Sequence, residues 1–256
     1  MLEGARFLRL EQDGRIARLT LARPRVLNAM SFAMVLELER AVEAIGQDPD
    51  SAVVVIRGEG RAFCSGIDLK ELAAGDSPHE YHQHFERALR LLEEMPKIVL
   101  AVMHGWCLGG GLQLALACDI RIARAATMLG LPAIKESLIP GLATFRLPKY
   151  VGLGWAKRLA LGGENLDAAA AHSIGLVDHV VAEDDFYLEV LRLEEHYLGA
   201  ASEGSRLSKV LLNRGSDLDY QRFLAEYLAL QRQTQSGADF QEAQRAYLEQ
   251  RPPTWS

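Results

Sequence analysis

The stretch HGWCLGGGLQLALACD, residues 104–119, places three consecutive glycines directly before an apolar run with helical spacing. Glycine has no Cβ, so a ligand can approach its backbone closely. The N–H groups in the first turn of a helix lack partners within the helix and carry partial positive charge. We therefore expect the N–H of Gly110 to face a ligand.

A second stretch, RAFCSGIDLKEL at residues 61–72, has the same layout of strand exit, glycine and helix-like run. Two unpaired N–H groups that converge form an oxyanion hole. We predict that the N–H groups of Ile67 and Gly110 together hold a carbonyl oxygen that becomes negative during reaction. A glycine run alone more often marks a flexible loop, and neither stretch has phosphate-loop spacing, so the prediction depends on the pair.

Strand and helix patterns alternate through the first half of the chain. Apolar and polar residues alternate on both sides of QDG, which predicts a hairpin with its turn at Asp13-Gly14. Pro24 ends the second strand of this hairpin. Ser31 is the expected N-cap of a helix that ends near Gly46. Apolar runs predict three buried strands, over residues 51–60, 96–105 and 118–126. An amphipathic pattern capped by Ser77-Pro78 predicts a helix over residues 77–95, between the first two strands.

The second half of the chain has a different composition. After about residue 155 alanines and helical periodicity dominate, and from about 186 to 250 every segment is typical of helix. This order predicts an α/β fold. We divide the chain into a core domain over 1–195 and a C-terminal helical region over 196–256, which packs on the core or on a neighbouring subunit.

Composition and charge narrow the function classes. The 256 residues are 49% apolar and 24% charged, with a net charge of -6 and no Lys/Arg run, which argues against nucleic acid as the main partner. No apolar run is long enough for a membrane span, and no secretory signal is visible at the N-terminus. The three cysteines include no CxxC pair, which suits a reducing compartment. We expect a cytoplasmic protein without a metal site.

Several motifs together resemble those of the crotonase superfamily, also called the enoyl-CoA hydratase/isomerase family. The matching stretches, which cover nearly the whole chain, are LARPRVLNAMS, AFCSGIDLKEL, the segment 101–123, LGLPAIKESLIPGLATFRLPKYVG and AHSIGLVDHVV. The resemblance implies a spiral core of ββα units with a C-terminal helical region that forms homotrimers or homohexamers. It also implies acyl-CoA substrates of fatty acid metabolism, with coenzyme A entering as part of the substrate and no separate cofactor.

The resemblance also assigns residues. The two oxyanion amides fall on Ile67 and Gly110, as the backbone argument predicts. The two glutamates that family hydratases use for acid–base work on water fall on Gln113 and Ala133. Neither an amide nor a methyl group transfers protons at neutral pH, and each lost acid or base costs roughly 10²–10⁴ in rate. We therefore expect that ordinary two-glutamate hydration does not occur.

Glu136 is the candidate replacement base. It lies three residues after Ala133, and residues at that spacing on a helical turn share a face. A single carboxylate in the cavity could move a proton between C2 and C4 of a 3-enoyl-CoA, which is an isomerase reaction. The alternative is a solvated loop charge beside Lys135. Gln113 either replaces an acid with loss of function or uses its amide to hold a substrate oxygen or water.

Further candidates carry less weight. The resemblance places Tyr81 and His82 beside the acyl pocket, and we expect His82 to be a partly exposed helix residue and His104 to have a structural hydrogen bond. The cysteines are expected to be packing residues, and Asp68 and Asp119 structural. For coenzyme A the matching positions are Arg25, Ala62, Ser65, Ile67 and Lys70, although Arg25 and Lys70 are also compatible with plain surface charges.

Three functions remain open from the sequence. The first is a CoA-thioester lyase or isomerase with an intact oxyanion hole and a relocated acid–base group. The second is a non-catalytic acyl-CoA-binding protein. The third is a CoA-thioester decarboxylase or hydrolase, in which the oxyanion hole supplies much of the rate.

Overall fold

The computed structural model describes residues 4–75, 80–215 and 217–255. Its strands are β1 Leu8–Asp13, β2 Ile16–Leu21, β3 Val53–Gly58, β4 Ile98–Met103, β5 Trp106–Leu108, β6 Ile120–Arg124, β7 Met128–Gly130, β8 Asn165–Asp167 and β9 His179–Val181. Its α-helices are α1 Phe32–Gln47, α2 Leu69–Ala74, α3 Glu80–Glu94, α4 Gly110–Leu116, α5 Ala143–Gly162, α6 Ala168–Ser173, α7 Phe186–Ala200, α8 Glu203–Arg214, α9 Tyr220–Ser236 and α10 Ala238–Glu249. Two 3₁₀ helices, η1 Pro24–Val26 and η2 Pro132–Glu136, complete the elements.

The strands form a six-stranded sheet in the order β1-β2-β3-β4-β6-β9 and a three-stranded sheet in the order β5-β7-β8. β1 and β2 form the expected antiparallel hairpin, and the other pairs of the large sheet are parallel. Asp13 pairs with Ile16, so the loop is Gly14-Arg15, one residue later than predicted. Gly14 has a φ of 55°, a conformation that glycine adopts without strain.

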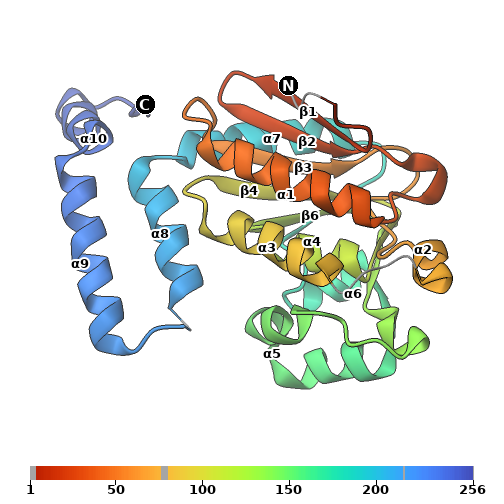
Figure 1. Cartoon of the computed structure of the whole chain (residues 1–256). Coiled ribbons are helices and arrows are strands. Elements are labelled where there is room, and N and C mark those ends of the chain that lie inside the picture. The colour runs from red at the N-terminus through yellow and green to blue at the C-terminus, as the bar shows by residue number, and fades with distance from the viewer. Residues whose placement is uncertain (1–3, 76–79, 216, 256) are drawn as a thin grey trace.

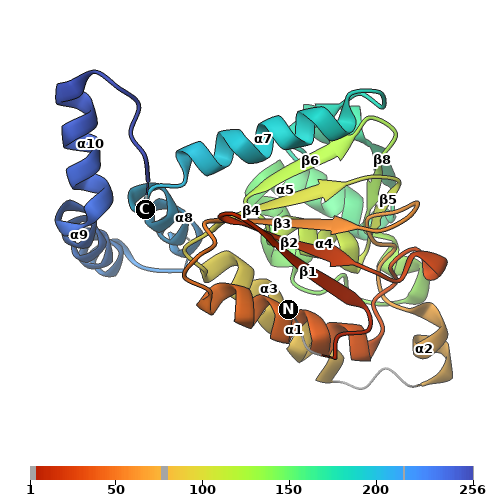
Figure 2. The same cartoon turned by 90° about the horizontal axis from the view of Figure 1, so that it is seen from above.

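The predicted first helix and the buried strands are confirmed. The Ser31 hydroxyl caps α1 by accepting from the N–H of Met34, and α1 ends at Gln47, one residue past the predicted end. β3 and β4 are flanked on both faces, by α1 and α3 on one side and α7 on the other (Figure 2). Val54 packs in the cluster on the α1 side, whereas its neighbour Val55 packs in the cluster on the α7 side. A strand covered on both faces has no polar alternation, which explains its continuous apolar run.

The helices expected from about residue 186 to 250 are confirmed as α7 to α10, but two short strands interrupt the helical pattern between residues 155 and 186. β8 pairs with β7, and β9 joins the edge of the large sheet beside β6. Each has three residues, which is too short to show the period-two alternation that identifies a strand. The α/β class is confirmed, while the expected cap at Ser77-Pro78, together with His79, lies outside the described residues.

The C-terminal helices extend away from the sheet. α7 lies along the sheet, α8 packs against α3, and α9 and α10 project from the body (Figure 1). α9 has no buried residue. The expected domain limit at residue 195 falls within α7. No helix among the described residues is both long and apolar enough to cross a membrane.

Candidate active site

The chain segments that leave β3 and β4 run side by side beyond the sheet. The N–H of Cys64 donates to the carbonyl of Trp106 at 3.0 Å, and the N–H of Leu108 donates to the carbonyl of Cys64 at 3.0 Å. Cys64 and Cys107 form a parallel bridge. This short ladder brings the two glycine-containing stretches together, although they lie more than forty residues apart in sequence.

The glycines allow the two segments to touch. Gly66 has a φ of 105°, and a Cβ there would lie 3.1 Å from the carbonyl oxygen of Leu108 and 3.4 Å from the nitrogen of Gly110. A Cβ on Gly111 would lie 2.4 Å from the carbonyl oxygen of Cys64. A side chain at either position would push the segments apart. The glycine run is therefore required for close backbone contact as well as for access to the N–H groups.

The N–H groups of Ile67 and Gly110 are both left without a protein acceptor. Met30 pairs with the backbone on either side of Ile67: its N–H donates to Gly66 at 2.8 Å, and its carbonyl accepts from Asp68 at 3.0 Å. In such a parallel bridge the N–H of the middle residue points away from its partner. Gly110 is the first residue of α4, whose initial N–H groups have no helical partner. Neither N–H has an acceptor in the described part of the chain.

Both residues line one pocket of about 90 Å³. The loop after β3 contributes Ser65, Gly66, Ile67 and Leu69, the turn and α4 contribute Gly109, Gly110 and Gln113, α3 contributes Tyr81, His82 and Phe85, and η2 with the following loop contributes Pro132, Ala133, Glu136 and residues 138–141. The walls are largely apolar, as in most small-molecule sites. Unpaired backbone donors at an apolar pocket suit a carbonyl that gains negative charge.

The pocket contains Glu136 as well as Ala133. Both belong to η2, and residues three apart in a 3₁₀ helix lie one above the other. Glu136 is exposed and is the only carboxylate among the described residues that line the pocket. The sequence left open whether the Glu136 side chain reaches the cavity. In the structure Glu136 lies beside Ala133, at the pocket wall.

Gln113 is buried, with 9% of its surface exposed, and its Oε1 has no hydrogen-bond partner. A Cβ on Gly141 would lie 2.3 Å from that oxygen, so the loop packs directly on the amide. Arg146 holds this loop through Glu86, which it pairs with at 2.7 Å and which in turn accepts from the N–H of Leu142 at 3.0 Å. The sequence analysis missed this clamp because its members lie on α3 and α5, far apart in the chain.

Comparisons with known proteins identify the family. The model of enoyl-CoA hydratase/isomerase matches residues 11–256. The chain belongs to the enoyl-CoA hydratase/isomerase family. It is 34% identical to the crotonyl-CoA hydratase of Syntrophomonas wolfei, over 94% of this chain and 95% of that one. It is also 34% identical to the mitochondrial methylglutaconyl-CoA hydratase of Mus musculus, over 96% of this chain and 81% of that one.

The fold agrees with solved structures of this family. The enoyl-CoA hydratase of Bacillus anthracis aligns with a TM-score of 0.91 at 29% identity, over 98% of this chain and 99% of that one. The predicted crotonase fold and family membership are thereby confirmed. The enoyl-CoA hydratase/isomerase family acts on acyl-CoA thioesters.

The predicted coenzyme A residues are not gathered at the pocket. Ser65 and Ile67 line it, but Arg25 and Lys70 are exposed elsewhere, on η1 and at the start of α2. Ala62 is fully buried, and its carbonyl accepts from Nδ2 of Asn28 at 2.8 Å. Coenzyme A binding at Arg25, Ala62 and Lys70 stays a prediction.

The three cysteines are free and buried. Burial raises the pKa of the Cys64 thiol to about 12, and burial also raises the pKa values of Cys107 and Cys118. A protonated thiol is a poor nucleophile, so these side chains act in packing. Asp68 is structural, because it caps α2 and pairs with Arg23 at 3.0 Å.

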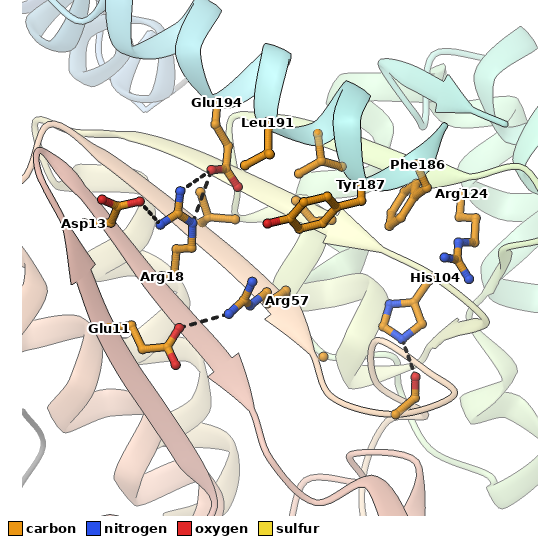
Figure 3. Close-up of a pocket in the computed structure, with 15 residues that line it drawn as sticks. Glu11, Asp13, Arg18, Arg57, His104, Arg124, Phe186, Tyr187, Leu191 and Glu194 are labelled. Atoms are coloured by element: carbon orange, nitrogen blue, oxygen red, sulfur yellow. Dashed lines mark hydrogen bonds and ion pairs between the residues drawn. The ribbon is translucent and has the colours of Figure 1, made fainter. Parts of the chain in front are cut away.

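A larger cavity of about 500 Å³ lies between α7 and the face of the large sheet opposite α1 and α3 (Figure 3). Its charged groups are largely satisfied: Arg18 pairs with Asp13 at 2.7 Å and with Glu194 at 2.6 Å. His104 lines it and makes the expected structural hydrogen bond, from Nε2 to the carbonyl of Gly60 at 2.9 Å. Burial lowers the pKa of His104, which favours the neutral ring. The two unpaired backbone N–H groups are found at the smaller pocket, which is the better candidate site.

Metal chemistry has no obvious location in the described ranges. No group of three or more His, Cys, Asp or Glu side chains there is arranged to hold a metal ion.

Proposed function

We propose that this chain binds an acyl-CoA thioester in the pocket beside α4 and shifts the double bond of a 3-enoyl-CoA to the 2-position. The observation that carries the proposal is Glu136, the one carboxylate that the described residues contribute to the pocket wall. Isomerisation needs a single base that removes and returns one proton. Hydration by the family's two-glutamate route needs two proton-transfer groups at positions that Gln113 and Ala133 occupy.

The proposed steps balance with this one base. Glu136 removes a proton from C2, and the electron pair moves onto the thioester oxygen to give a dienolate. The N–H groups of Ile67 and Gly110 stabilise that oxyanion; removing one such donor from an enzyme costs roughly 10²–10³ in kcat. Glu136 then returns the proton at C4, the negative charge leaves the oxygen, and the double bond lies between C2 and C3.

The coenzyme moiety is proposed to follow the main chain near Ser65 and Ile67, with Arg25, Ala62 and Lys70 further along its path. Coenzyme A enters with the substrate, and no other cofactor is part of the proposal. A role in fatty acid metabolism and a cytoplasmic location are proposed on the family resemblance and on composition.

We propose that the protein is a homotrimer or homohexamer held in part by the α9–α10 arm. Tyr247 and Leu248 on α10 are 83% and 81% exposed, on a helix pair that contacts little of its own chain. Exposed apolar patches of this kind mark protein contacts. The double change Tyr247→Ser with Leu248→Asp is expected to yield monomers in light scattering. The matched change Tyr187→Ser, at a 70% exposed tyrosine on α7, should leave the assembly intact, and an unchanged mass of the double variant would contradict the role of the arm.

Two thioesters test the proposed reaction. With 3-hexenoyl-CoA the purified protein is expected to form 2-hexenoyl-CoA, followed by the absorbance of the conjugated thioester. With crotonyl-CoA, hydration is expected to be slower by about 10² or more, because a proton-transfer group is missing. Hydration at a rate similar to isomerisation would overturn the proposal. Tight thioester binding with no turnover would instead support the acyl-CoA-binding protein.

A further inference from the structure

The side chain of Glu136 has no partner that fixes it at the pocket wall. It makes no hydrogen bond or ion pair within the described residues, so the position of its carboxylate depends on the backbone that carries it. That backbone is the segment 132–142, which comprises η2 and the loop before α5. The place of the carboxylate in the pocket therefore depends on how the two ends of this segment are held.

The hydrogen bonds within the segment hold its shape. The N–H of Ser137 donates to the carbonyl of Ile134 at 3.1 Å, and the N–H of Leu138 donates to the carbonyl of Ala133 at 2.9 Å. In the described ranges, no backbone N–H of residues 132–141 donates to a residue outside the segment. These bonds form the turn around Glu136, but they do not fix it relative to the rest of the pocket.

The first end of the segment is fixed by the sheet. β7 ends at Gly130, which pairs with Leu108 of β5 on one side and with Asn165 of β8 on the other. The next residue, Leu131, is fully buried in the core. The segment thus begins at a point that cannot move without disrupting the three-stranded sheet.

The second end is held by a side chain of α3. The N–H of Leu142, the N-cap residue of α5, donates to Oε1 of Glu86 at 3.0 Å. Oε2 of Glu86 pairs with Nη1 of Arg146 at 2.7 Å, and Arg146 is buried. A carboxylate at the start of a helix is in a favourable position for both the free N–H groups and the helix dipole. Glu86 therefore joins the end of the segment to α3, the helix that supplies Tyr81 and Phe85 to the pocket.

Glu93 offers an internal comparison, because it shares the arginine but not the segment. Nε of Arg146 donates to Oε1 of Glu93 at 2.8 Å, and Nη2 donates to Oε2 at 3.1 Å. Glu93 also lies on α3, but within the described residues its carboxylate accepts no hydrogen bond from the segment 132–142. Comparing the two glutamates separates the hydrogen bond to Leu142 from the charge pair with Arg146.

We propose that Glu86 is a positioning residue for the base, because its hydrogen bond to Leu142 holds the segment that presents the Glu136 carboxylate to C2 of the acyl group. This inference rests on the proposed isomerisation by Glu136. A displacement of about 1 Å in a reacting group can cost roughly 10²-fold in rate. Glu86 does not line the pocket, so it acts through the segment.

Three variants test the role of the hydrogen bond. Glu86→Met removes the acceptor at similar size and is expected to lower kcat for 3-hexenoyl-CoA about tenfold or more. Glu86→Gln keeps an oxygen that accepts from Leu142, and Glu93→Met removes only a partner of Arg146, so both are expected to keep kcat close to that of the unchanged protein. Calorimetry should show little change in pentanoyl-CoA affinity for all three, because the N–H groups of Ile67 and Gly110 are untouched.

A double variant distinguishes positioning of the base from a general loss of structure. If Glu86 acts through the base, adding Glu86→Met to Glu136→Gln is expected to lower kcat no further. A general loss of structure would lower kcat equally in both backgrounds. If Glu86→Met does not fold, Glu86→Asp takes its place in every comparison, because its carboxylate is one methylene shorter and lies out of reach of Leu142.

Four results would overturn the inference. These are an unchanged kcat in Glu86→Met, an equal loss in Glu93→Met, a Glu86→Gln variant as slow as Glu86→Met, and an undiminished effect of Glu86→Met in the Glu136→Gln background. In each case isomerisation of 3-hexenoyl-CoA by the unchanged protein would leave the proposed function standing. No isomerisation by the unchanged protein would remove the proposed function and this inference together.

Discussion

Replacing Glu136 with glutamine is expected to lower kcat for the isomerisation of 3-hexenoyl-CoA by about 10²–10⁴, the range for removal of a general base. Glutamine keeps the size and polarity of the side chain but cannot take a proton from C2. No other carboxylate from the described residues lines the pocket, so none is placed to substitute. The KM is expected to change little, because the oxyanion donors and the apolar walls are untouched. Steady-state kinetics at saturating substrate provide the measurement.

Glu43→Gln is the matched control for this variant. Glu43 is exposed on α1 and does not line the pocket, so the kcat of the Glu43→Gln variant should equal that of the unchanged protein. Calorimetry should show that both variants bind pentanoyl-CoA as the unchanged protein does. Full turnover by Glu136→Gln would contradict the proposed role of Glu136 as the base. Glu136 would then be a solvated loop charge, and another group would have to supply the base.

The placement of two unpaired N–H groups at one pocket could be predicted from sequence because it depends on local features. A strand exit, a glycine and a helix start each leave a local pattern, and parallel strands bring their carboxyl ends to one edge. The N–H groups of Ile67 and Gly110 therefore follow from two short stretches and one assumption about the sheet. The assumption holds because β3 and β4 are direct neighbours.

Features that depend on distant side chains could not be predicted. Nothing in the sequence around Arg146 indicates that it pairs with Glu86 and holds the loop over Gln113. Likewise, a tyrosine at position 81 suggests a pocket wall but not whether its hydroxyl has a partner. That property requires the positions of every neighbouring donor and acceptor.

The connection between the C-terminal helices and the core is another feature of this kind. Lys209 on α8 is 8% exposed, and its Nζ donates to the carbonyls of Leu92 and Lys97 at 2.7 and 2.8 Å and pairs with Asp119 at 2.9 Å. Asp119 also accepts from the N–H of Val99 at 2.7 Å. Burial lowers the pKa of Lys209 and raises the pKa of Asp119, so the desolvation of both charges is substantial. Asp119 is structural, as expected, but its partner lies ninety residues later.

Replacing Lys209 with methionine is expected to lower the free energy of unfolding by about 3–5 kcal/mol, because it leaves the charge of Asp119 buried and unpaired. For a chain of this size each kcal/mol lowers Tm by roughly 2–4 °C, so a fall of about 6–20 °C is expected in thermal unfolding. Lys157→Met, at an exposed lysine on α5, should change the free energy by no more than about 0.5 kcal/mol.

A second variant separates the unpaired charge from lost packing. Adding Asp119→Asn to Lys209→Met removes the buried charge and keeps an acceptor for the N–H of Val99, so the double variant is expected to be more stable than Lys209→Met alone. Residues in one ion pair are not additive, and the sign of this coupling identifies the pair as the cause. If the double variant is less stable by the full sum of the single changes, the two side chains act independently and the connection depends on apolar packing between α3 and α8.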